Sequence, residues 1–315
     1  MKEKMNQQVE RMKAQTFGVE VEMNHITRAN AAKVAAEYFG TTRYEDSARR
    51  NGYHAWSAWD AQGREWKFVY DSSIRGANDQ KCEMVTPILH YEDMEMLQEL
   101  CRKLRKAGAK SDYTRGCGVH IHIGAQGHTA QSLRNLANIM ASHEMLLVNA
   151  LKINAGRLLT YCKPVNTDFI EAINDKKPTK MADLADIWYE THHASWDRDA
   201  HYNRSRYHML NLHATFTKGT VEFRLFQFNA PDGNHRSGIH AGALKAYIQL
   251  CLAMSQMAKE VKSASAKPQQ TDNPKYAMRT WLLRMGFIGD EFATARDLLT
   301  RNLDGDAAFR NGRAA

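Results

Sequence analysis

The chain has 315 residues, of which 43% are hydrophobic and 25% charged, and its formal net charge is +8. This composition is that of a folded globular protein and excludes an intrinsically disordered one. No apolar run approaches the roughly 20 residues of a membrane helix, and the charged residues 1–13 lack the apolar core of a secretory signal. We therefore expect a cytoplasmic protein with no membrane partner. The positive charge favours anionic partners without choosing among nucleotides, carboxylates and nucleic acid.

The five cysteines are scattered singly and form no C-x-x-C pair. This pattern argues against a cysteine-based zinc site. An odd count without framework spacing is typical of a reducing cytosol. We interpret the cysteines as free structural residues, with a reactive Cys117 as the alternative.

Strands and helices alternate in the first part of the chain. Residues 17–23 alternate apolar and acidic side chains with the two-residue period of a strand. Thr27 and Gly40 are the predicted N-cap and terminator of the next helix, and Pro87 ends a later strand. The predicted elements are a strand at 17–23, a helix at 29–38, a hairpin formed by 56–59 and 66–70, a strand at 81–86 and a helix at 91–107.

The later part is mainly helical, with two more strand regions. The predicted elements are a strand at 119–123, a long helix at about 129–155, a helix at 181–191, a hairpin of 209–216 and 220–228 around Lys218-Gly219, a helix at 237–259, and two short helices near the end. Because the strands come in antiparallel pairs with helices between them, we expect an α+β fold rather than a doubly wound parallel sheet.

Composition divides the chain into one large domain and smaller flanking segments. Residues 263–270, rich in Ser, Ala, Lys and Gln, are typical of a linker. The predicted parts are an N-terminal extension at 1–15, the main domain at 16–260, a linker at 261–272, C-terminal helices at 273–302 and a polar tail at 303–315.

Two glutamates share one face of the first strand. Glu20 and Glu22 are separated by one residue, which places them about 6.5–7 Å apart along the same side of a strand. Carboxylates at that spacing repel each other unless cations lie between them, and their hard oxygens suit Mg²⁺ or Mn²⁺. The alternative is a solvated face with unpaired acids.

Two histidines follow the same pattern at residues 119–123. His120 and His122 form an H-x-H motif, which can hold a transition metal. Gly116, Gly118 and the preceding Arg115 also allow a phosphate site, because glycine lets a ligand approach the backbone. The alternative is a pair of unrelated strand histidines.

A charged pair lies on the last predicted strand, where Glu222 and Arg224 share one face. They form either a local ion pair, or a further metal ligand beside a guanidinium that binds phosphate or carboxylate. Residues from other segments could join such a site: Asp71, Glu83, Arg157, Arg204 and Arg206. Five histidines between 192 and 213 have spacings that fit no metal pattern, and we interpret them as loop composition.

Taken in order, these segments resemble the amidoligase family, a divergent branch of the glutamine synthetase and glutamate–cysteine ligase superfamily. The resemblance spans about residues 16–259. The segments that carry it are 17–22, 66–73, 83–87, 116–124, Arg157 with 161–164, Arg206-Tyr207 before 210–212, and 219–226.

The resemblance implies an ATP-dependent carboxylate–amine ligase. In the wider superfamily a curved, mainly antiparallel sheet holds divalent ions on a polar catalytic face and packs helices on the other. ATP phosphorylates a carboxylate there, and an amine attacks the acyl phosphate to give an amide. The expected ligands of Mg²⁺ or Mn²⁺ are Glu20, Glu22, Glu83, His122 and Glu222. The residues expected to bind ATP, phosphate or substrate are Arg115, His120, Arg157, Arg206, Asn211 and Arg224. The expected catalytic residues are Glu20, Glu22, Asp71, His120 and Arg224.

Two other functions stay open at this point. The same residues could hold Zn²⁺ or Mn²⁺ in a hydrolase that cleaves an amide or phosphoester without ATP. The net charge could instead serve a non-catalytic nucleic-acid-binding protein, although the sequence contains no RRM, helix-turn-helix or zinc-finger pattern. The sequence does not name the acid and the amine, which could be an amino acid, a peptide, a protein or a modified nucleobase.

Overall fold

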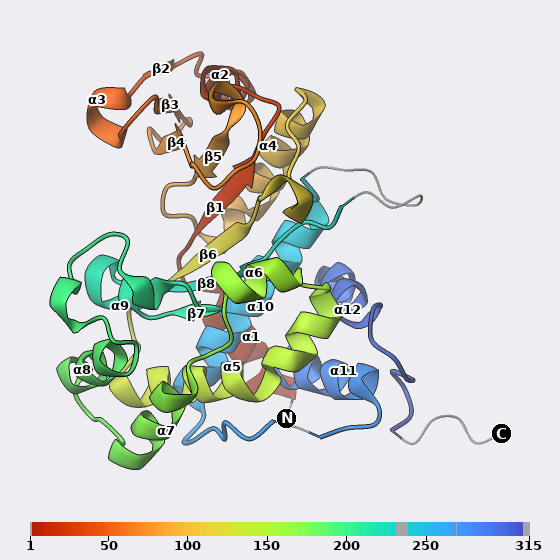
Figure 1. Ribbon diagram of the computed structural model, residues 1–315. Helices are drawn as coiled ribbons and strands as arrows, with labels where there is room; N and C mark the ends of the chain where they lie inside the picture. The colour runs from red at the N-terminus through yellow and green to blue at the C-terminus, as the bar shows by residue number, and fades with distance from the viewer. Residues whose placement is uncertain (1, 231–238, 269, 311–315) are drawn as a thin grey trace. The chain divides into compact units, whose positions relative to one another are not determined.

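The computed structural model describes residues 2–230, 239–268 and 270–310 (Figure 1). The chain divides into two compact units, and each is described by itself. The β-rich unit comprises residues 16–121 and 226–245; the α-rich unit comprises 1–15, 122–225 and 246–315. The predicted division into extension, main domain, linker, C-terminal helices and tail stays a prediction. Residues 1, 231–238, 269 and 311–315, which fall in the predicted extension, main domain, linker and tail, lie outside the described residues.

The β-rich unit is built on strands that hydrogen-bond in the order β2-β3-β4-β5-β1-β6. The pairs β2–β3, β3–β4, β4–β5 and β5–β1 are antiparallel. The strands are β1 (Phe17–Met23), β2 (Tyr44–Asp46), β3 (Trp56–Trp59), β4 (Glu65–Val69), β5 (Cys82–Val85) and β6 (Val119–Gly124), which continues into the α-rich unit. The helices are α2 (Arg28–Phe39), α3 (Ala48–Asn51) and α4 (Met94–Lys106), with 3₁₀ turns at Asn78–Gln80, Tyr91–Asp93 and Tyr113–Arg115.

One face of these strands forms a core with α2, which packs against β3, β4 and α4 (Figure 1). Val19 and Val21 of β1 and Trp66 and Phe68 of β4 are at most 1% exposed. Each such side chain contributes on the order of 2–3 kcal/mol by leaving water. The residues between them point to the opposite face, which is therefore free to carry polar groups.

Local signals in the sequence set the boundaries of these elements. The Thr27 side chain accepts a hydrogen bond from Asn30 N and caps α2, and Gly40 ends that helix with φ at 69°. The turn between β3 and β4 is closed by Asp60, whose Oδ1 accepts hydrogen bonds from the backbone of Gln62 and Arg64. The predicted helix and hairpin are thus confirmed, with their caps.

The α-rich unit contains the second half of β6, followed by β8 (Thr220–Phe226) and β7 (Leu210–Asn211) in hydrogen-bonded order. The longer helices are α1 (Lys2–Lys13), α5 (Ala130–Leu151), α7 (Thr167–Lys176), α8 (Met181–Thr191), α10 (Ala241–Glu260, which starts in the β-rich unit), α11 (Pro274–Arg284) and α12 (Ala293–Thr300). The short helices are α6 (Ala155–Thr160), α9 (His213–Lys218) and the 3₁₀ turns Ser195–Asp197, Arg204–Arg206 and Asp290–Phe292.

Helix packing organises this unit around α5. The helices α7 and α12 both pack against α5, α8 packs against α7, and α11 packs against α12. The N-terminal helix is fixed to the C-terminal segments, because Lys13 Nζ lies 2.8 Å from Glu291 Oε2 and Arg11 Nη2 lies 2.6 Å from Glu260 Oε1. The two short helices predicted near the C-terminus are confirmed as α11 and α12.

Two predicted elements of the α-rich unit are wrong in part. Residues 209–216 do not form a full strand: β7 stops at Asn211, whose Oδ1 accepts a hydrogen bond from His213 N and begins α9. The helix predicted at 129–155 ends at Leu151, because Lys152 adopts φ of 50°, and Asn154 then caps a separate helix, α6. In both places an asparagine side chain accepts a hydrogen bond from the backbone N–H two residues ahead: Asn211 from His213 N before α9, and Asn154 from Gly156 N at the start of α6.

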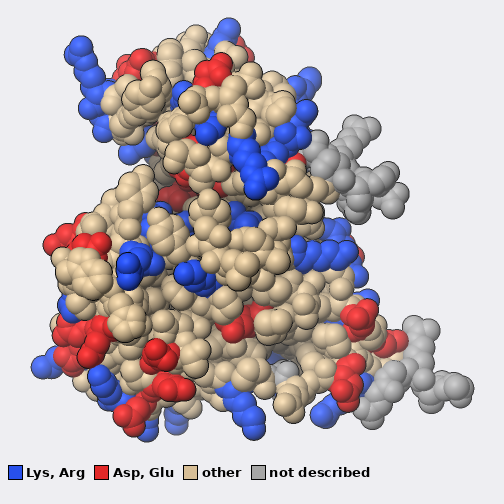
Figure 2. Space-filling model, in the orientation of Figure 1, with Lys and Arg blue, Asp and Glu red and all other residues tan. Residues whose placement is uncertain are grey.

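The paired strands with inserted helices confirm an α+β fold with an antiparallel sheet. Across the described residues, no helix is both long and apolar enough to cross a membrane. Acidic side chains gather around α7 and α8 on the face shown in Figure 2. The net positive charge is therefore not spread as one basic surface on that face.

Candidate functional site

Three glutamates meet on neighbouring strands of the β-rich unit. The register of β1 and β5 pairs Glu22 with Glu83 and Glu20 with Val85. Residues that are directly opposite each other point to the same face, so the three carboxylates share one face. Glu22 is only 4% exposed, whereas Glu20 and Glu83 are half-buried.

His120, on the neighbouring strand β6, contacts two of these acids. Its Nδ1 lies 3.0 Å from Glu20 Oε2, and its Nε2 lies 3.9 Å from Glu22 Oε1. The residue is 4% exposed. Both nitrogens of the imidazole thus face carboxylate oxygens, an arrangement that a bound metal ion stabilises.

Two sets of side chains in this unit bring ligand atoms within 4.8 Å of one another: Glu20, Glu83 and His120, and Glu22, Asp71 and Glu83. We call these five residues the acidic cluster. Four carboxylates gathered so closely repel each other unless cations neutralise them. The donor set is mainly carboxylate oxygen, which fits Mg²⁺ or Mn²⁺, and the single imidazole suits Mn²⁺ better than Mg²⁺.

Asp71 reaches the acidic cluster from the loop after β4. Its Oδ1 accepts a hydrogen bond from Ser73 N at 2.6 Å, which closes a tight turn. This turn packs on Gly116, where φ is 72° and an added Cβ would lie 2.8 Å from Ser73 O. Only glycine fits this close approach. One glycine of the segment before β6 therefore positions a carboxylate.

The remaining part of that segment fixes Glu22. Gly118 N donates a hydrogen bond to Glu22 Oε2 at 2.6 Å, which orients the buried carboxylate. Burial raises the pKa of the Cys117 thiol, and the charge of Glu22 raises it further. A thiol with a raised pKa is a poor nucleophile, which argues against a reactive Cys117.

Arg115 is placed differently from the other predicted residues of this unit. Its Nε donates a hydrogen bond at 2.9 Å to Asp112 Oδ2, and Asp112 is fully buried. Its Nη1 lies 3.5 Å from His25 Nδ1. The guanidinium thus supports the loop before β6, and its role in phosphate binding stays a prediction.

In the α-rich unit, a buried polar group surrounds Glu222. Asn211 lies directly opposite Glu222 in the register of β7 and β8, and its Nδ2 donates to Glu222 Oε2 at 2.6 Å. Arg224 Nη1 donates to Glu222 Oε1. All three residues are at most 4% exposed. A buried ion pair is stable only when its spare hydrogen-bonding groups are also satisfied, and Asn211 supplies one such bond.

Arg157 is attached to the same strand through the backbone. Its Nη2 donates to Arg224 O at 3.2 Å, and the residue is 6% exposed. The Tyr207 ring lies beside two guanidinium groups, with its centroid 5.8 Å from Cζ of both Arg206 and Arg224. Three predicted arginines, Arg157, Arg206 and Arg224, are thus gathered around one strand and one aromatic ring.

His122 belongs to this second group. Its Nδ1 lies 2.9 Å from Thr220 Oγ1 and its Nε2 lies 3.9 Å from Glu222 Oε1. The H-x-H motif therefore divides between two environments: His120 faces the acids of the β-rich unit, and His122 faces Thr220 and Glu222 in the α-rich unit.

Two other histidines of the α-rich unit form hydrogen bonds within the protein, and one of them, His213, begins α9 rather than lying in a loop. His213 Nδ1 lies 2.8 Å from the Tyr189 hydroxyl, and His208 Nδ1 lies 2.6 Å from Pro164 O. Neither is in a metal-ligand set within the described residues.

Sequence reasoning missed several supporting groups. Asn211 was predicted to bind a ligand, but its bond to Glu222 could be foreseen only from the strand register. The Gly118 N–H and the Tyr207 ring carry no ionisable group and gave no signal in a search for charged patterns. Lys67 lies on the polar side of β4, and an isolated lysine in a strand carries no motif that would single it out.

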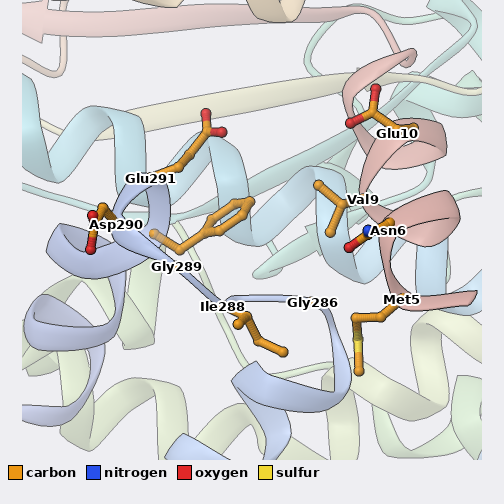
Figure 3. A pocket seen from close by; sticks show the side chains of 10 residues that line it. Met5, Asn6, Val9, Glu10, Gly286, Ile288, Gly289, Asp290 and Glu291 are labelled. Atoms are coloured by element: carbon orange, nitrogen blue, oxygen red, sulfur yellow. The ribbon is translucent and has the colours of Figure 1, made fainter. Parts of the chain in front are cut away.

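A pocket in the α-rich unit lies between α1 and the segment Gly286–Phe292 and contains none of the predicted site residues (Figure 3). Its volume is about 560 Å³, and its wall is mainly apolar. Val9 and Ile288 line it, and Glu10 and Glu291 lie along it. It holds no cluster of catalytic groups.

Comparison with known proteins gives one family match. Residues 13–255 match the family described as "Putative amidoligase enzyme". No curated protein matches the chain. Among solved structures, the chain is similar to a bifunctional glutathione synthetase from Pasteurella multocida, with 14% identity and a TM-score of 0.41. That alignment covers 95% of this chain and 48% of the other, so the chain spans about half the length of the structure it matches. At this TM-score the likeness supports no conclusion about function.

The family match covers most of the chain and includes every predicted site residue from Glu20 to Arg224. It confirms the resemblance that the ordered strand motifs indicated. The chain belongs to the amidoligase family.

Proposed function

We propose that this chain is an ATP-dependent carboxylate–amine ligase that forms an amide bond through an acyl phosphate. The observation that carries the proposal is the acidic cluster, in which four carboxylates and His120 lie on one sheet face of a chain from the amidoligase family. Such a cluster has a clear use in phosphoryl transfer, where charge on phosphate oxygens must be neutralised.

The proposed reaction has two steps. A carboxylate oxygen of the acid substrate attacks the γ-phosphorus of ATP, the bond to the bridging oxygen breaks, and ADP leaves. The amine nitrogen then attacks the acyl carbon, the carbon–oxygen bond to phosphate breaks, and inorganic phosphate leaves as the nitrogen loses a proton. Both steps develop negative charge on oxygen, which fixed cationic groups stabilise.

The acidic cluster would hold Mg²⁺ or Mn²⁺ through Glu20, Glu22 and Glu83, with His120 as a further ligand or a phosphate contact. The bound cation would neutralise phosphate charge. Gly118 N and the Gly116 turn keep Glu22 and Asp71 in place before the ligands arrive. Asp71, half-buried at the edge of the cluster, is the proposed contact for the amine, whose proton a carboxylate can accept.

In the α-rich unit, Arg224 and Arg157 are the proposed contacts for phosphate or for the substrate carboxylate, with Arg206 as a further one. A guanidinium that is already oriented by Glu222 needs little reorganisation when an anion binds. Glu222 and His122 remain proposed metal ligands. The bonds that Glu222 accepts from Asn211 and Arg224 compete with that role.

Hydroxylamine provides a direct test, because it attacks acyl phosphates and gives stable hydroxamates. The chain would be incubated with ATP, Mn²⁺ and hydroxylamine, together with a panel of amino acids and peptides as the acid. We expect ADP release and hydroxamate to appear together, only when acid and ATP are both present, and to vanish in Glu22→Gln.

A metal-dependent hydrolase is the second candidate, because His120 among carboxylates also suits Zn²⁺. A hydrolase would cleave amide or phosphoester substrates with metal alone. Turnover without ATP would therefore contradict the ligase and support this alternative.

A further inference from the structure

Lys67 lies on the same sheet face as the acidic cluster. In β4 it sits between Trp66 and Phe68, which are both fully buried on the opposite, core-facing side. The register pairs Lys67 with Val85 of β5, and Val85 with Glu20 of β1. Lys67, Val85 and Glu20 therefore form one row across three strands and point to one side.

The distance between Lys67 and the acidic cluster follows from this row. Two strand spacings separate the backbones of Lys67 and Glu20, which is roughly 9.5–10 Å. Val85 stands between them with a short apolar side chain. A flexible four-carbon stem lets an ammonium group lean across that gap, so an anion held beside Glu20 is within reach of Lys67.

Within the described residues, no side-chain hydrogen bond or ion pair involves the ammonium of Lys67, and its charge acts on the protein only as one of several causes that lower the pKa of Glu65. Its strand neighbour on the same face, Glu65, is occupied by other groups. Glu65 Oε1 accepts hydrogen bonds from Ser57 at 2.7 Å and Asn51 at 2.9 Å, and lies 3.3 Å from Arg50 Nη2.

Lys81 provides a contrast within the same unit. It lies two residues before Glu83 and so is also near the cluster in sequence. Its Nζ donates to Ser72 O at 3.3 Å and lies 5.8 Å from the centre of the Tyr70 ring. The ammonium of Lys81 is thus hydrogen-bonded to the loop that carries Asp71. The ammonium of Lys67 forms no hydrogen bond or ion pair within the described residues.

The charge balance of the acidic cluster indicates a function for Lys67. The acidic cluster carries four carboxylates, and two divalent cations would bring their summed charge to zero. A phosphate or carboxylate arriving at the loaded site then adds net negative charge, which a lysine on the same face offsets. Lysine is a compact point charge that commonly contacts phosphate.

We infer that Lys67 binds an oxyanion of the substrate, a phosphate or a carboxylate, beside the acidic cluster. The inference rests on the proposed function, because it takes the cluster as the place where anionic substrates meet divalent cations. It adds a substrate-binding residue that the sequence motifs did not indicate.

The test measures binding rather than turnover. Mn²⁺ affinity is measured by electron paramagnetic resonance, and the affinities of inorganic pyrophosphate and of succinate by calorimetry, each with and without Mn²⁺. The variants are Lys67→Met, which keeps an unbranched stem, Lys67→Arg, which keeps the charge, and Lys106→Met on α4 as an exposed-lysine control from the same unit. Thermal unfolding verifies that each variant is folded.

Lys67→Met should weaken anion binding by about tenfold or more, a typical effect of losing one charged hydrogen bond. Lys67→Arg should retain most of the affinity, and Lys106→Met should be unchanged. Loss for pyrophosphate alone identifies a phosphate contact, and loss for succinate alone identifies a carboxylate contact.

Equal affinities of wild type and Lys67→Met for both anions would overturn the inference, and so would a wild type that binds neither anion. The metal measurement separates the two proposals. A wild type that binds no Mn²⁺ refutes the proposed cation site, whereas a wild type that binds Mn²⁺ and loses no anion affinity in Lys67→Met refutes the role of Lys67 alone.

Discussion

At the scale of single residues, Arg224 shows how neighbouring side chains hold a buried charge. Its Nη1 donates to Glu222, and its Nε lies 3.5 Å from Tyr161 O. Taking two charges out of water costs several kcal/mol per ion, so the pair depends on its geometry and on the additional bond from Asn211. Removing one member would leave an uncompensated charge in a site that is almost closed to solvent.

Arg224→Lys keeps the positive charge and removes the planar fork. We expect turnover in the ligase assay to fall about 100-fold, the effect of losing one oriented donor in a transition state. Circular dichroism should show a folded protein. Arg198→Lys, at a half-buried arginine paired with Asp186, is the control. Normal turnover in Arg224→Lys would remove Arg224 from the mechanism.

Protonation of His192 sets a pH dependence of stability. Burial, together with the smaller effect of the nearby His208, lowers the pKa of His192 from 6.5 to about 3. Between these values the unfolded chain binds a proton that the folded protein excludes. The contribution of neutral His192 is therefore complete above pH 6.5 and is lost as the pH falls toward 3, by at most about 1.4 kcal/mol per pH unit.

His192→Gln should reduce the slope of unfolding free energy against pH between 4.5 and 6.5, measured by urea denaturation. A residual slope is expected, because burial also lowers the pKa of His128 to about 3. His201→Gln, at an exposed position, should keep the wild-type slope. An unchanged slope in His192→Gln would show that His192 does not titrate as proposed.

At the scale of elements, the loop after β4 and the segment before β6 act together. The Asp71 turn lies on Gly116, and Asn24 Nδ2 donates to Arg75 O at 2.8 Å on the same loop. The backbone also joins the two segments, since Arg75 N donates to Arg115 O at 2.8 Å. A carboxylate from an irregular loop is thus held by backbone contacts to a neighbouring segment.

Gly116→Ala should disturb this arrangement, because the new Cβ would meet Ser73 O at 2.8 Å at a φ of 72°. We expect a loss of about 1–3 kcal/mol of stability and weaker Mn²⁺ binding, measured by denaturation and by paramagnetic resonance. Gly63→Ala is the matched control, because φ is 75° there and no atom lies within 4 Å of the added Cβ. It should cost about 1–2 kcal/mol and leave Mn²⁺ affinity intact. Equal Mn²⁺ affinities in the two variants would contradict a positioning role for Gly116.

At the scale of the whole molecule, the net charge of +8 and the acidic cluster point to different ligands. Carboxylates on an open sheet face would repel phosphate unless cations intervene. Nucleic acid bound by charge alone would make no use of the acidic cluster, and its affinity would fall steeply as the salt concentration rises.

Cations and nucleotide should therefore stabilise the folded protein by mass action. We expect Mn²⁺ with a non-hydrolysable ATP analogue to raise the melting temperature, by an amount equivalent to about 2.7 kcal/mol at a hundredfold excess over Kd. The double variant Glu20→Ala/Glu22→Ala should show no such shift in differential scanning fluorimetry. An equal rise in melting temperature in the wild type and the double variant would show that Mn²⁺ and the ATP analogue bind at another site.

Some of the fold could be read from local signals. Thr27 and Gly40 delimit α2, and the alternation of 17–23 predicts β1, because a cap and a strand period depend only on neighbouring residues. The second hairpin could not be read correctly: β-prone residues at 209–216 favour a strand, but the Asn211 side chain bonds His213 N and begins α9. The hydrogen bond from His213 N to the Asn211 side chain outweighed the strand propensity of these residues.

For the candidate site, the sequence by itself indicated the family to which the chain belongs, and it predicted the residues proposed for the chemistry. Period-two alternation places Glu20, Glu22 and His120 on a polar strand face whatever the partners of that strand are. Only the tertiary structure decided which strands are neighbours and in what register. That register places Glu22 opposite Glu83 and Lys67 in one row with Glu20. Register and loop packing depend on contacts between residues far apart in the chain, which no local pattern encodes.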